Sequence, residues 1–272
     1  MTLLAQTAAD DLDVVLVVIT LLGGLAVFLH GLDRLTDSIR LVAGDRMRGV
    51  LRRLTGNRFA GLATGAGVTA VIQSSSVTTV LVVGFVAGGL MTFGQSIAVI
   101  MGANVGTTVT AQIIAFDLGR YALALVAAGF GVSFFSRQQS RRGWGTLVMG
   151  LGLVFFGMDL MGDAKSPLRD QTAFRDAMAR LDAPLLGVLA GAVFTALVQS
   201  SSATTGVVIV LAAQGLISLE AGIAVVLGAN IGTAITAILA AIGRPPEAVR
   251  AAVVHTRFNL VGAEAWLFLS GP

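Results

Sequence analysis

Two copies of a polar motif in an otherwise apolar chain could hold an anion. The motif reads QSSSVTT at residues 73–79 and QSSSATT at residues 199–205. Serine and threonine hydroxyls favour the start of a helix, where unpaired backbone N–H groups and the helix dipole attract negative charge. A glutamine adds a carbonyl oxygen and an amide donor. We therefore interpret each motif as a break in a helix whose second arm begins at an anion site.

A second pair of polar motifs suits a cation. It reads GANVGTT at residues 102–108 and GANIGTA at residues 228–234. Two glycines around an asparagine predict local unwinding, which would free backbone carbonyl oxygens. These oxygens, with those of Asn and Thr side chains, are hard ligands that suit an alkali cation, and cations are favoured at the C-terminal ends of half-helices. The absence of carboxylates from both motifs favours a monovalent ion over Ca²⁺.

Each of these groups also has a purely structural interpretation. Serine and threonine in membrane helices often bond to a backbone carbonyl or to a neighbouring helix. The small-residue pairs Gly61/Gly65 and Gly187/Gly191 predict close helix packing. A binding role is favoured for QSSS because the tetrapeptide is kept in both halves of the chain while the apolar residues around it change.

The composition places the chain in a membrane. Of 272 residues, 55% are hydrophobic and only 12% are charged, with a mean hydropathy of +0.86. A soluble domain carries roughly 25% charged residues. Long continuous apolar runs predict transmembrane helices, and the lack of period-two alternation argues against a β-barrel. The chain has no cysteine, which excludes disulfides and thiolate metal sites, and we expect no transition metal and no nucleic-acid partner.

The chain is duplicated. The segment that begins TGAGVTAVIQSSS at Thr64 recurs as AGAVFTALVQSSS at Ala190, so the second copy lies 126 residues after the first without a gap. We expect one transporter-like membrane domain over residues 1–272, built from repeat 1 at 12–136 and repeat 2 at 144–269.

Each repeat is expected to contain a re-entrant helical hairpin, at 59–92 and 184–217, because the polar motif leaves two arms that are too short to span a bilayer. Full spans are predicted at 12–32, 95–116, 121–135, 144–161, 221–242 and 248–269. A hairpin enters and leaves on one side, so each repeat crosses the membrane an odd number of times. The two repeats must then have inverted topology, as is common in secondary transporters. The predicted fold class is an all-α polytopic membrane protein with two inverted repeats.

The arginines predict the orientation. The segment 40–58 contains six arginines against one aspartate, and further arginines lie at 137–142 and 244–250. The loop at 162–182 carries equal numbers of acidic and basic residues, and the N-terminus is acidic. The positive-inside rule then places the N-terminus outside and the basic segments in the cytoplasm. We interpret these arginines as topology signals or as contacts with lipid headgroups rather than as a substrate site.

An enzyme is disfavoured. A serine nucleophile needs a base, and the only histidines, His30 and His255, lie in no recognisable motif with a serine. His255, Arg257 and Asn259 are unusual in an apolar segment, where an ionisable group is a functional suspect. Their roles are left open, because Arg257 could equally reach the membrane surface or pair with a carboxylate.

The two QSSS motifs resemble those of the type II sodium/phosphate cotransporters, the sodium–phosphate symporter family. The GAN-[IV]-GT motif about 25 residues later and VHTRFN at 254–259 are similar to the same family. The resemblance extends from about Gly23 to the end of the chain. It implies a bacterial inner-membrane, multi-pass protein that carries inorganic phosphate with Na⁺ by symport and alternating access, with the phosphate between the two hairpin tips.

The resemblance also implies site residues. The expected phosphate ligands are the hydroxyls of Ser74, Ser75, Ser76, Thr78, Ser200, Ser201, Ser202 and Thr204. The expected Na⁺ ligands are Gln73, Gln199, Thr79, Thr205, Asn104, Asn230, Thr107 and Thr233. No cofactor other than the coupling ion Na⁺ is expected, and a homodimer is an open alternative. The alternative functions are transport of another oxyanion, phosphate export, and phosphate sensing without transport.

Overall fold

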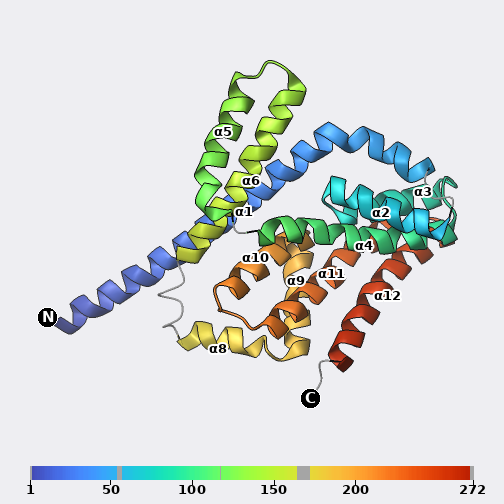
Figure 1. The fold of residues 1–272 in the computed structure, drawn as a ribbon. Coiled ribbons are helices and arrows are strands. Elements are labelled where there is room, and N and C mark those ends of the chain that lie inside the picture. The colour runs from blue at the N-terminus through green and yellow to red at the C-terminus, as the bar shows by residue number, and fades with distance from the viewer. Residues whose placement is uncertain (1, 54–56, 117, 164–171, 270–272) are drawn as a thin grey trace. The chain divides into compact units, whose positions relative to one another are not determined.

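The computed structural model describes residues 2–53, 57–116, 118–163 and 172–269, and every element in these ranges is helical (Figure 1). The side chains of residues 2–15, 40–49, 52–53, 163 and 172–175 are outside the description. The first part of the chain forms α1 (Thr2–Arg53), α2 (Arg58–Ile72), α3 (Ser75–Ala87), α4 (Phe93–Ala115), the 3₁₀ turn η1 (Gly119–Tyr121) and α5 (Ala122–Phe135). The second part forms α6 (Gln139–Asp163), α8 (Thr172–Arg180), α9 (Pro184–Val198), α10 (Ser201–Ala213), α11 (Leu219–Ala241) and α12 (Pro246–Leu269).

The helix breaks predicted at the two QSSS motifs are confirmed. The first falls between α2 and α3, and the second between α9 and α10. The helices α9, α10 and α11 each begin and end 126 residues after α2, α3 and α4, from 58 and 184 at the start to 115 and 241 at the end. The duplication seen in the sequence therefore extends to the boundaries of the helices.

Within the described residues, four helices are long and apolar enough to cross a membrane: Leu16–Ile39, Phe93–Ala115, Gln139–Gly162 and Leu219–Ala241. The hairpin arms are shorter, at 15 residues for α2 and α9 and 13 for α3 and α10. At about 1.5 Å per residue, a 15-residue arm is about 22 Å long, less than the roughly 30 Å of a bilayer core. The arms thus have the length expected of re-entrant segments.

The end predicted for the first span, at residue 32, is wrong, because α1 continues without a break through most of the basic segment 40–58 to Arg53. Leucine, methionine and arginine are good helix formers and dominate this segment. The positive-inside rule depends on where the arginines lie, and it holds whether their segment is a loop or a helix. In the predicted outer loop at 162–182, residues 164–171 lie outside the described residues, and α8 forms a helix that the sequence interpretation did not include.

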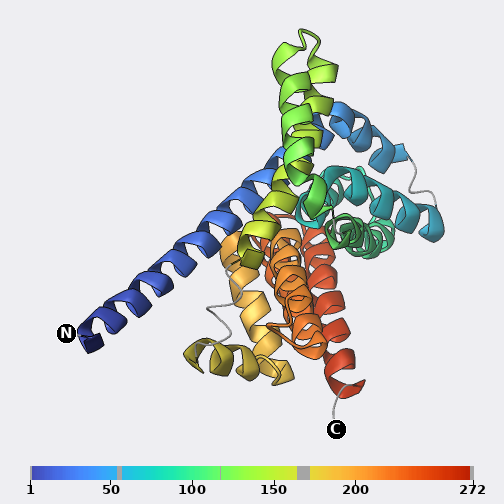
Figure 2. The same ribbon diagram turned by 60° about the vertical axis from the view of Figure 1, so that its left-hand side comes forward.

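The chain divides into two compact units that do not coincide with the two repeats. Unit 1 comprises residues 1–38, 117–182 and 209–218, and unit 2 comprises residues 39–116, 183–208 and 219–272. Unit 2 therefore contains both QSSS motifs together with α2, α3, α4, α9, α11 and α12. Within it, α9, α11 and α12, coloured yellow to red, lie side by side (Figure 2).

In unit 2 each first hairpin arm packs directly on the long helix of its own repeat. A methyl group on Gly65 would lie within 3.0 Å of the Val99 carbonyl, and one on Gly102 equally close to the Leu62 carbonyl. One turn beyond Gly102, a methyl group on Gly106 would meet the Ala66 carbonyl, one turn beyond Leu62. Because the contacts on both helices move forward by four residues, α2 and α4 run parallel. Gly191 and Gly228 make the matching contacts between α9 and α11. The packing predicted for Gly65 and Gly191 is therefore confirmed.

In unit 1 the helices α1 and α6 pack antiparallel, again through glycine. A methyl group on Gly24 would reach the backbone of Gly157 and Met161, whereas one on Gly31 would reach the backbone of Gly150 and Val154. Since rising numbers on α1 meet falling numbers on α6, the two helices run in opposite directions.

Candidate functional site

Each hairpin tip is built on a glutamine in a left-handed backbone conformation. Gln73 and Gln199 both have φ of 59°, and they are the only non-glycine residues with positive φ among the described residues. The backbone N–H of Gln73 closes α2 by donating to the Thr69 carbonyl at 2.7 Å, and Gln199 bonds to Thr195 in the same way at 2.7 Å. Glycine usually occupies such a position, because this conformation costs other residues about 1–2 kcal/mol. A strained residue kept at both tips points to a role for its side chain.

The first serine of each motif caps the second arm. Ser74 has an extended backbone, and its hydroxyl oxygen accepts from the Val77 N–H at 3.3 Å. Ser200 accepts from the Ala203 N–H at 3.2 Å. In both caps the serine oxygen accepts, so each hydroxyl keeps its O–H group to donate.

The following serines are the free groups of the tips. Ser75 and Ser201 are each 5% exposed, and Ser202 is 8% exposed. Among the described residues, no protein partner accepts from the hydroxyls of Ser75, Ser76, Ser201 and Ser202. Their backbone N–H groups occupy the first turn of α3 or α10, where a helix has no internal acceptor. Each tip therefore offers paired N–H and O–H donors suited to an oxyanion.

The first threonine of each motif, Thr78 or Thr204, links the two arms of its hairpin. The Thr69 hydroxyl donates to that of Thr78 at 2.9 Å, and the hydroxyls of Thr195 and Thr204 lie 2.6 Å apart. Thr78 also donates to the Ser74 carbonyl at 3.1 Å. These bonds favour a structural role for Thr78 and Thr204, although their assignment to phosphate stays a prediction. The sequence analysis did not identify their partners Thr69 and Thr195. These two threonines occupy the same position in both repeats, and that match could have identified them.

The two tips differ in how their glutamines are held. Gln73 is 6% exposed, and its Oε1 accepts from the Thr110 hydroxyl of α4 at 2.5 Å. Gln199 is exposed, and Thr236, which matches Thr110 in repeat 2, donates instead to the Thr233 carbonyl at 2.8 Å. Each glutamine also donates through Nε2 to the carbonyl three residues before it. The second tip is therefore the less constrained of the two.

The predicted unwinding at the two GAN motifs is wrong. Both α4 and α11 run through them as uninterrupted helices of 23 residues. The glycines serve close packing instead, since a methyl group on Gly106 would meet Ala66 and Thr69, and one on Gly232 would meet Ala192. Backbone carbonyls in these motifs therefore stay within the helix, and a cation here would depend on side-chain oxygens.

Two predicted cation ligands have buried polar atoms that lack described partners. The Thr79 hydroxyl, in a residue that is 0% exposed, and the buried Nδ2 of Asn104 have no hydrogen-bond partner in the part of the chain that the structure describes. Such atoms are rare in proteins and often mark an ion or water position. An Nδ2 group donates, so it suits an anion or water, whereas the threonine oxygen suits either sign of charge.

The other predicted cation ligands are placed less distinctively. Thr107 and Thr233 donate to helix carbonyls at 3.1 and 3.2 Å, which leaves their lone pairs available. Asn230 is half-buried, and its carbonyl accepts from Asn259 Nδ2 of α12 at 2.9 Å. Asn259 thereby fixes α12 on α11. His255, one turn earlier, is 1% exposed, and its Nδ1 lacks a described partner.

Replacing Gln199 separates backbone strain from side-chain function. Gln199→Gly should be up to about 1 kcal/mol more stable than Gln199→Ala, because only glycine removes the left-handed penalty. Both variants should weaken Na⁺-dependent phosphate binding to a similar extent, since both lack the amide that is an expected Na⁺ ligand. Thermal unfolding and phosphate binding of the purified variants measure the two effects. Wild-type phosphate binding in either variant would show that the side chain is not part of the site.

Comparison with known proteins finds a family model that matches most of this chain. The family model described as Na⁺/Pi-cotransporter matches residues 27–163 and 170–270. YjbB of Escherichia coli (strain K12), whose name gives inorganic phosphate export as a proposed activity, is 34% identical over 250 residues, which cover 91% of this chain and 46% of that protein. The chain thus spans about half the length of this relative.

Two further relatives extend the comparison. YqeW of Bacillus subtilis (strain 168), an uncharacterized protein, is 31% identical over 236 residues, which cover 86% of this chain and 76% of that protein. Sodium-dependent phosphate transport protein 2B of Homo sapiens is 41% identical over 100 residues, which cover 36% of this chain and 14% of that protein. No solved structure matches the chain.

Proposed function

Because the chain belongs to the Na⁺/Pi-cotransporter family, we propose that it carries inorganic phosphate across the bacterial cytoplasmic membrane with Na⁺ as the coupling ion. Membership of a transporter family implies a transporter rather than an enzyme. The observation that carries the proposal is the pair of QSSS tips, which present free serine hydroxyls and first-turn N–H groups in one compact unit.

Phosphate binds between the two tips in this proposal. The donors of Ser75 and Ser76 approach it from α3, and those of Ser201 and Ser202 approach it from α10. Neither motif contains a lysine or arginine, so helix dipoles and hydroxyls supply the attraction. Because both motifs belong to unit 2, the complete site would move with that unit during alternating access.

Na⁺ provides the missing positive charge. The Thr79 hydroxyl is a buried oxygen without a described partner. The side-chain oxygens of Asn104, Thr205, Asn230 and the two glutamines are further proposed Na⁺ ligands. Binding of a cation beside the phosphate stabilises the phosphate, and linkage requires the reverse effect to be equal. Sodium coupling follows from this mutual compensation without any buried arginine.

The inverted arrangement of the repeats is supported by the pairing of α1 with α6. Gly24 and Gly31 match Gly150 and Gly157 in repeat 2, yet Gly24 faces Gly157 and Gly31 faces Gly150. A two-fold axis that relates α1 to α6 would pair the glycines in this exchanged way. Since the two helices are antiparallel, that axis lies perpendicular to them, in the membrane plane. The pairing itself does not choose a side for the N-terminus, and it is the positive-inside rule that favours an N-terminus outside.

Export is the second candidate, because the E. coli relative carries that activity in its name and matches 91% of this chain. Proteoliposomes loaded with or without Na⁺ distinguish the two directions. We expect labelled phosphate to move down an imposed Na⁺ gradient, with inward flux when Na⁺ is outside. Outward flux coupled to the same inward gradient would favour exchange-type export. Flux that is indifferent to Na⁺ would remove sodium coupling, and phosphate binding without flux would favour a sensor.

A further inference from the structure

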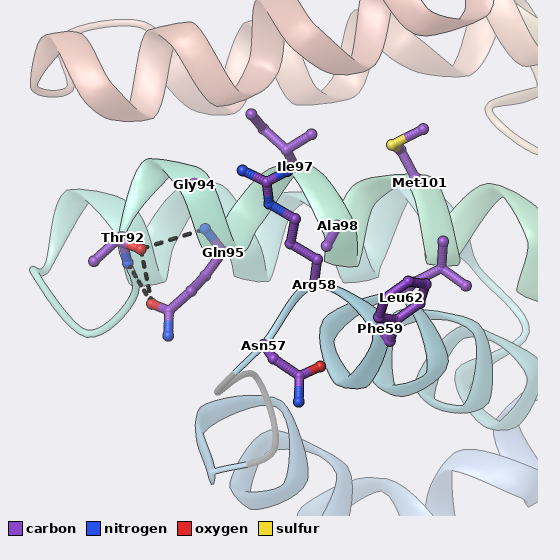
Figure 3. A pocket seen from close by; sticks show the side chains of 10 residues that line it. All are labelled: Asn57, Arg58, Phe59, Leu62, Thr92, Gly94, Gln95, Ile97, Ala98 and Met101. Atoms are coloured by element: carbon purple, nitrogen blue, oxygen red, sulfur yellow. Dashed lines mark hydrogen bonds between the residues drawn. The ribbon is translucent and has the colours of Figure 1, made fainter.

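A cavity of about 780 Å³ lies in unit 2, where α2 and α4 begin side by side (Figure 3). Its walls are mostly apolar, and its polar groups gather at the starts of the two helices. The lining residues that matter here are Arg58, Phe59, Leu62, Gly94, Ile97 and Met101. The volume falls within the roughly 300–1,000 Å³ of small-molecule sites. Phe59 is 86% exposed, as expected for a side chain that meets lipid rather than water.

Arg58 is the one ionisable side chain among the described residues that line the cavity. Figure 3 shows its side chain extending from the start of α2 across α4 towards Ile97. Among the side chains that the structure describes, no carboxylate pairs with it. The starts of both helices are capped, since Asn57 accepts from the Ala60 N–H at 2.7 Å and Thr92 forms a capping box with Gln95. The formal charge that attracts a ligand comes from the guanidinium, above an apolar wall.

The duplication supplies an internal comparison for this cavity. Its apolar wall is kept in repeat 2, where Leu62, Ile97 and Met101 become Val188, Ile223 and Leu227. Its charge is reversed, because Arg58 becomes Pro184 and Gly94 becomes Glu220. The same wall thus carries a positive charge in one repeat and a negative charge in the other. Helix packing accounts for the wall but not for this change of charge.

We propose that the cavity binds a phospholipid with a net negative headgroup, whose phosphate meets Arg58 and whose acyl chains lie on the wall of Phe59, Leu62, Ile97 and Met101. The positive charge of Arg58 favours an anionic ligand, and the apolar wall favours one with acyl chains. Free phosphate has no apolar part that could pack on the wall. The basic segment 40–58 places this end of α2 on the cytoplasmic side, where the leaflet is negatively charged. The proposal is independent of what the hairpin tips bind.

Native mass spectrometry of the purified chain with phosphatidylglycerol and phosphatidylcholine tests this site. The wild type should bind phosphatidylglycerol about five-fold more tightly, since one arginine near a membrane is worth about 1 kcal/mol. Arg58→Gln should remove that preference. Gly94→Glu, which copies repeat 2, should also remove it, and a Cβ atom at this position would meet nothing within 4 Å. Gly94→Gln and Arg137→Gln are the matched controls and should retain it.

Three results would overturn the proposal. One is a preference for phosphatidylglycerol that survives in both Arg58→Gln and Gly94→Glu. Another is equal binding of phosphatidylcholine by the wild type, which would indicate only annular lipid. The third is displacement of the lipid by millimolar inorganic phosphate, which would identify a free-phosphate site instead.

Discussion

Gly102→Ala is expected to destabilise the protein by about 3 kcal/mol or more, because the new methyl group would overlap the backbone of α2. The Leu62 carbonyl and the Ala66 N–H both lie within 3.0 Å of the position that this methyl would take. Backbone atoms cannot turn aside as a flexible side chain can, so the two helices must separate. Gly228→Ala should likewise force α9 and α11 apart, because the new methyl group would overlap the Val188 carbonyl.

The control for this expectation lies on the hairpin arm itself. A methyl group on Gly67 of α2 would meet nothing within 4 Å. Gly67→Ala should therefore stabilise the protein by up to about 1 kcal/mol, because alanine is the better helix former. Apparent melting temperature and monodispersity in detergent report the result. If Gly102→Ala and Gly67→Ala change the apparent melting temperature alike, the close approach of α2 to α4 does not stabilise the hairpin.

Ser75→Ala and Ser201→Ala should each weaken phosphate binding by about 10- to 100-fold. Each removes one hydroxyl donor to a charged ligand, and such a bond is worth about 1.5–3 kcal/mol. Folding should be little affected, since neither hydroxyl bonds to a described protein group. Equilibrium binding of labelled phosphate measures the effect, and thermal unfolding verifies that the variants are folded.

A matched control is Ser133→Ala, which removes a helix hydroxyl in unit 1, where Ser133 lies 3.2 Å from the Thr146 hydroxyl. Phosphate binding by this variant should equal that of the wild type. Equal losses in Ser133→Ala and Ser75→Ala would mean that a general loss of helix stability, rather than the tips, lowers binding.

The hairpin could be located from the sequence because its evidence is local. A polar run between two apolar arms predicts a break, and a copy 126 residues later shows that the break is kept. The structure places both breaks where expected and gives the helices on either side the same spacing. The close packing at the Gly-xxx-Gly pairs could also be predicted from the sequence, since small residues at that spacing leave room for a neighbouring helix.

The GAN motifs were misread because glycine in a helix has two explanations. Glycine lowers helix propensity, which suggested unwinding, but it also lets a second helix approach closely. At Gly102 and Gly106 the partner is α2, and only tertiary structure reveals that partner. The bond between Thr69 and Thr78 was missed for the same reason, because it joins two arms that are adjacent only once the hairpin has formed.

The central claim is that the two QSSS tips form one site, and the stoichiometry of phosphate binding tests it most directly. Labelled phosphate should bind the purified chain, in the presence of Na⁺, at one phosphate per chain. Ser75→Ala or Ser201→Ala alone should weaken that single site, and the double variant should lose less than the sum of the two effects because the donors share one ligand. Two phosphates per chain, with each serine variant removing one and leaving the other unchanged, would contradict a shared site.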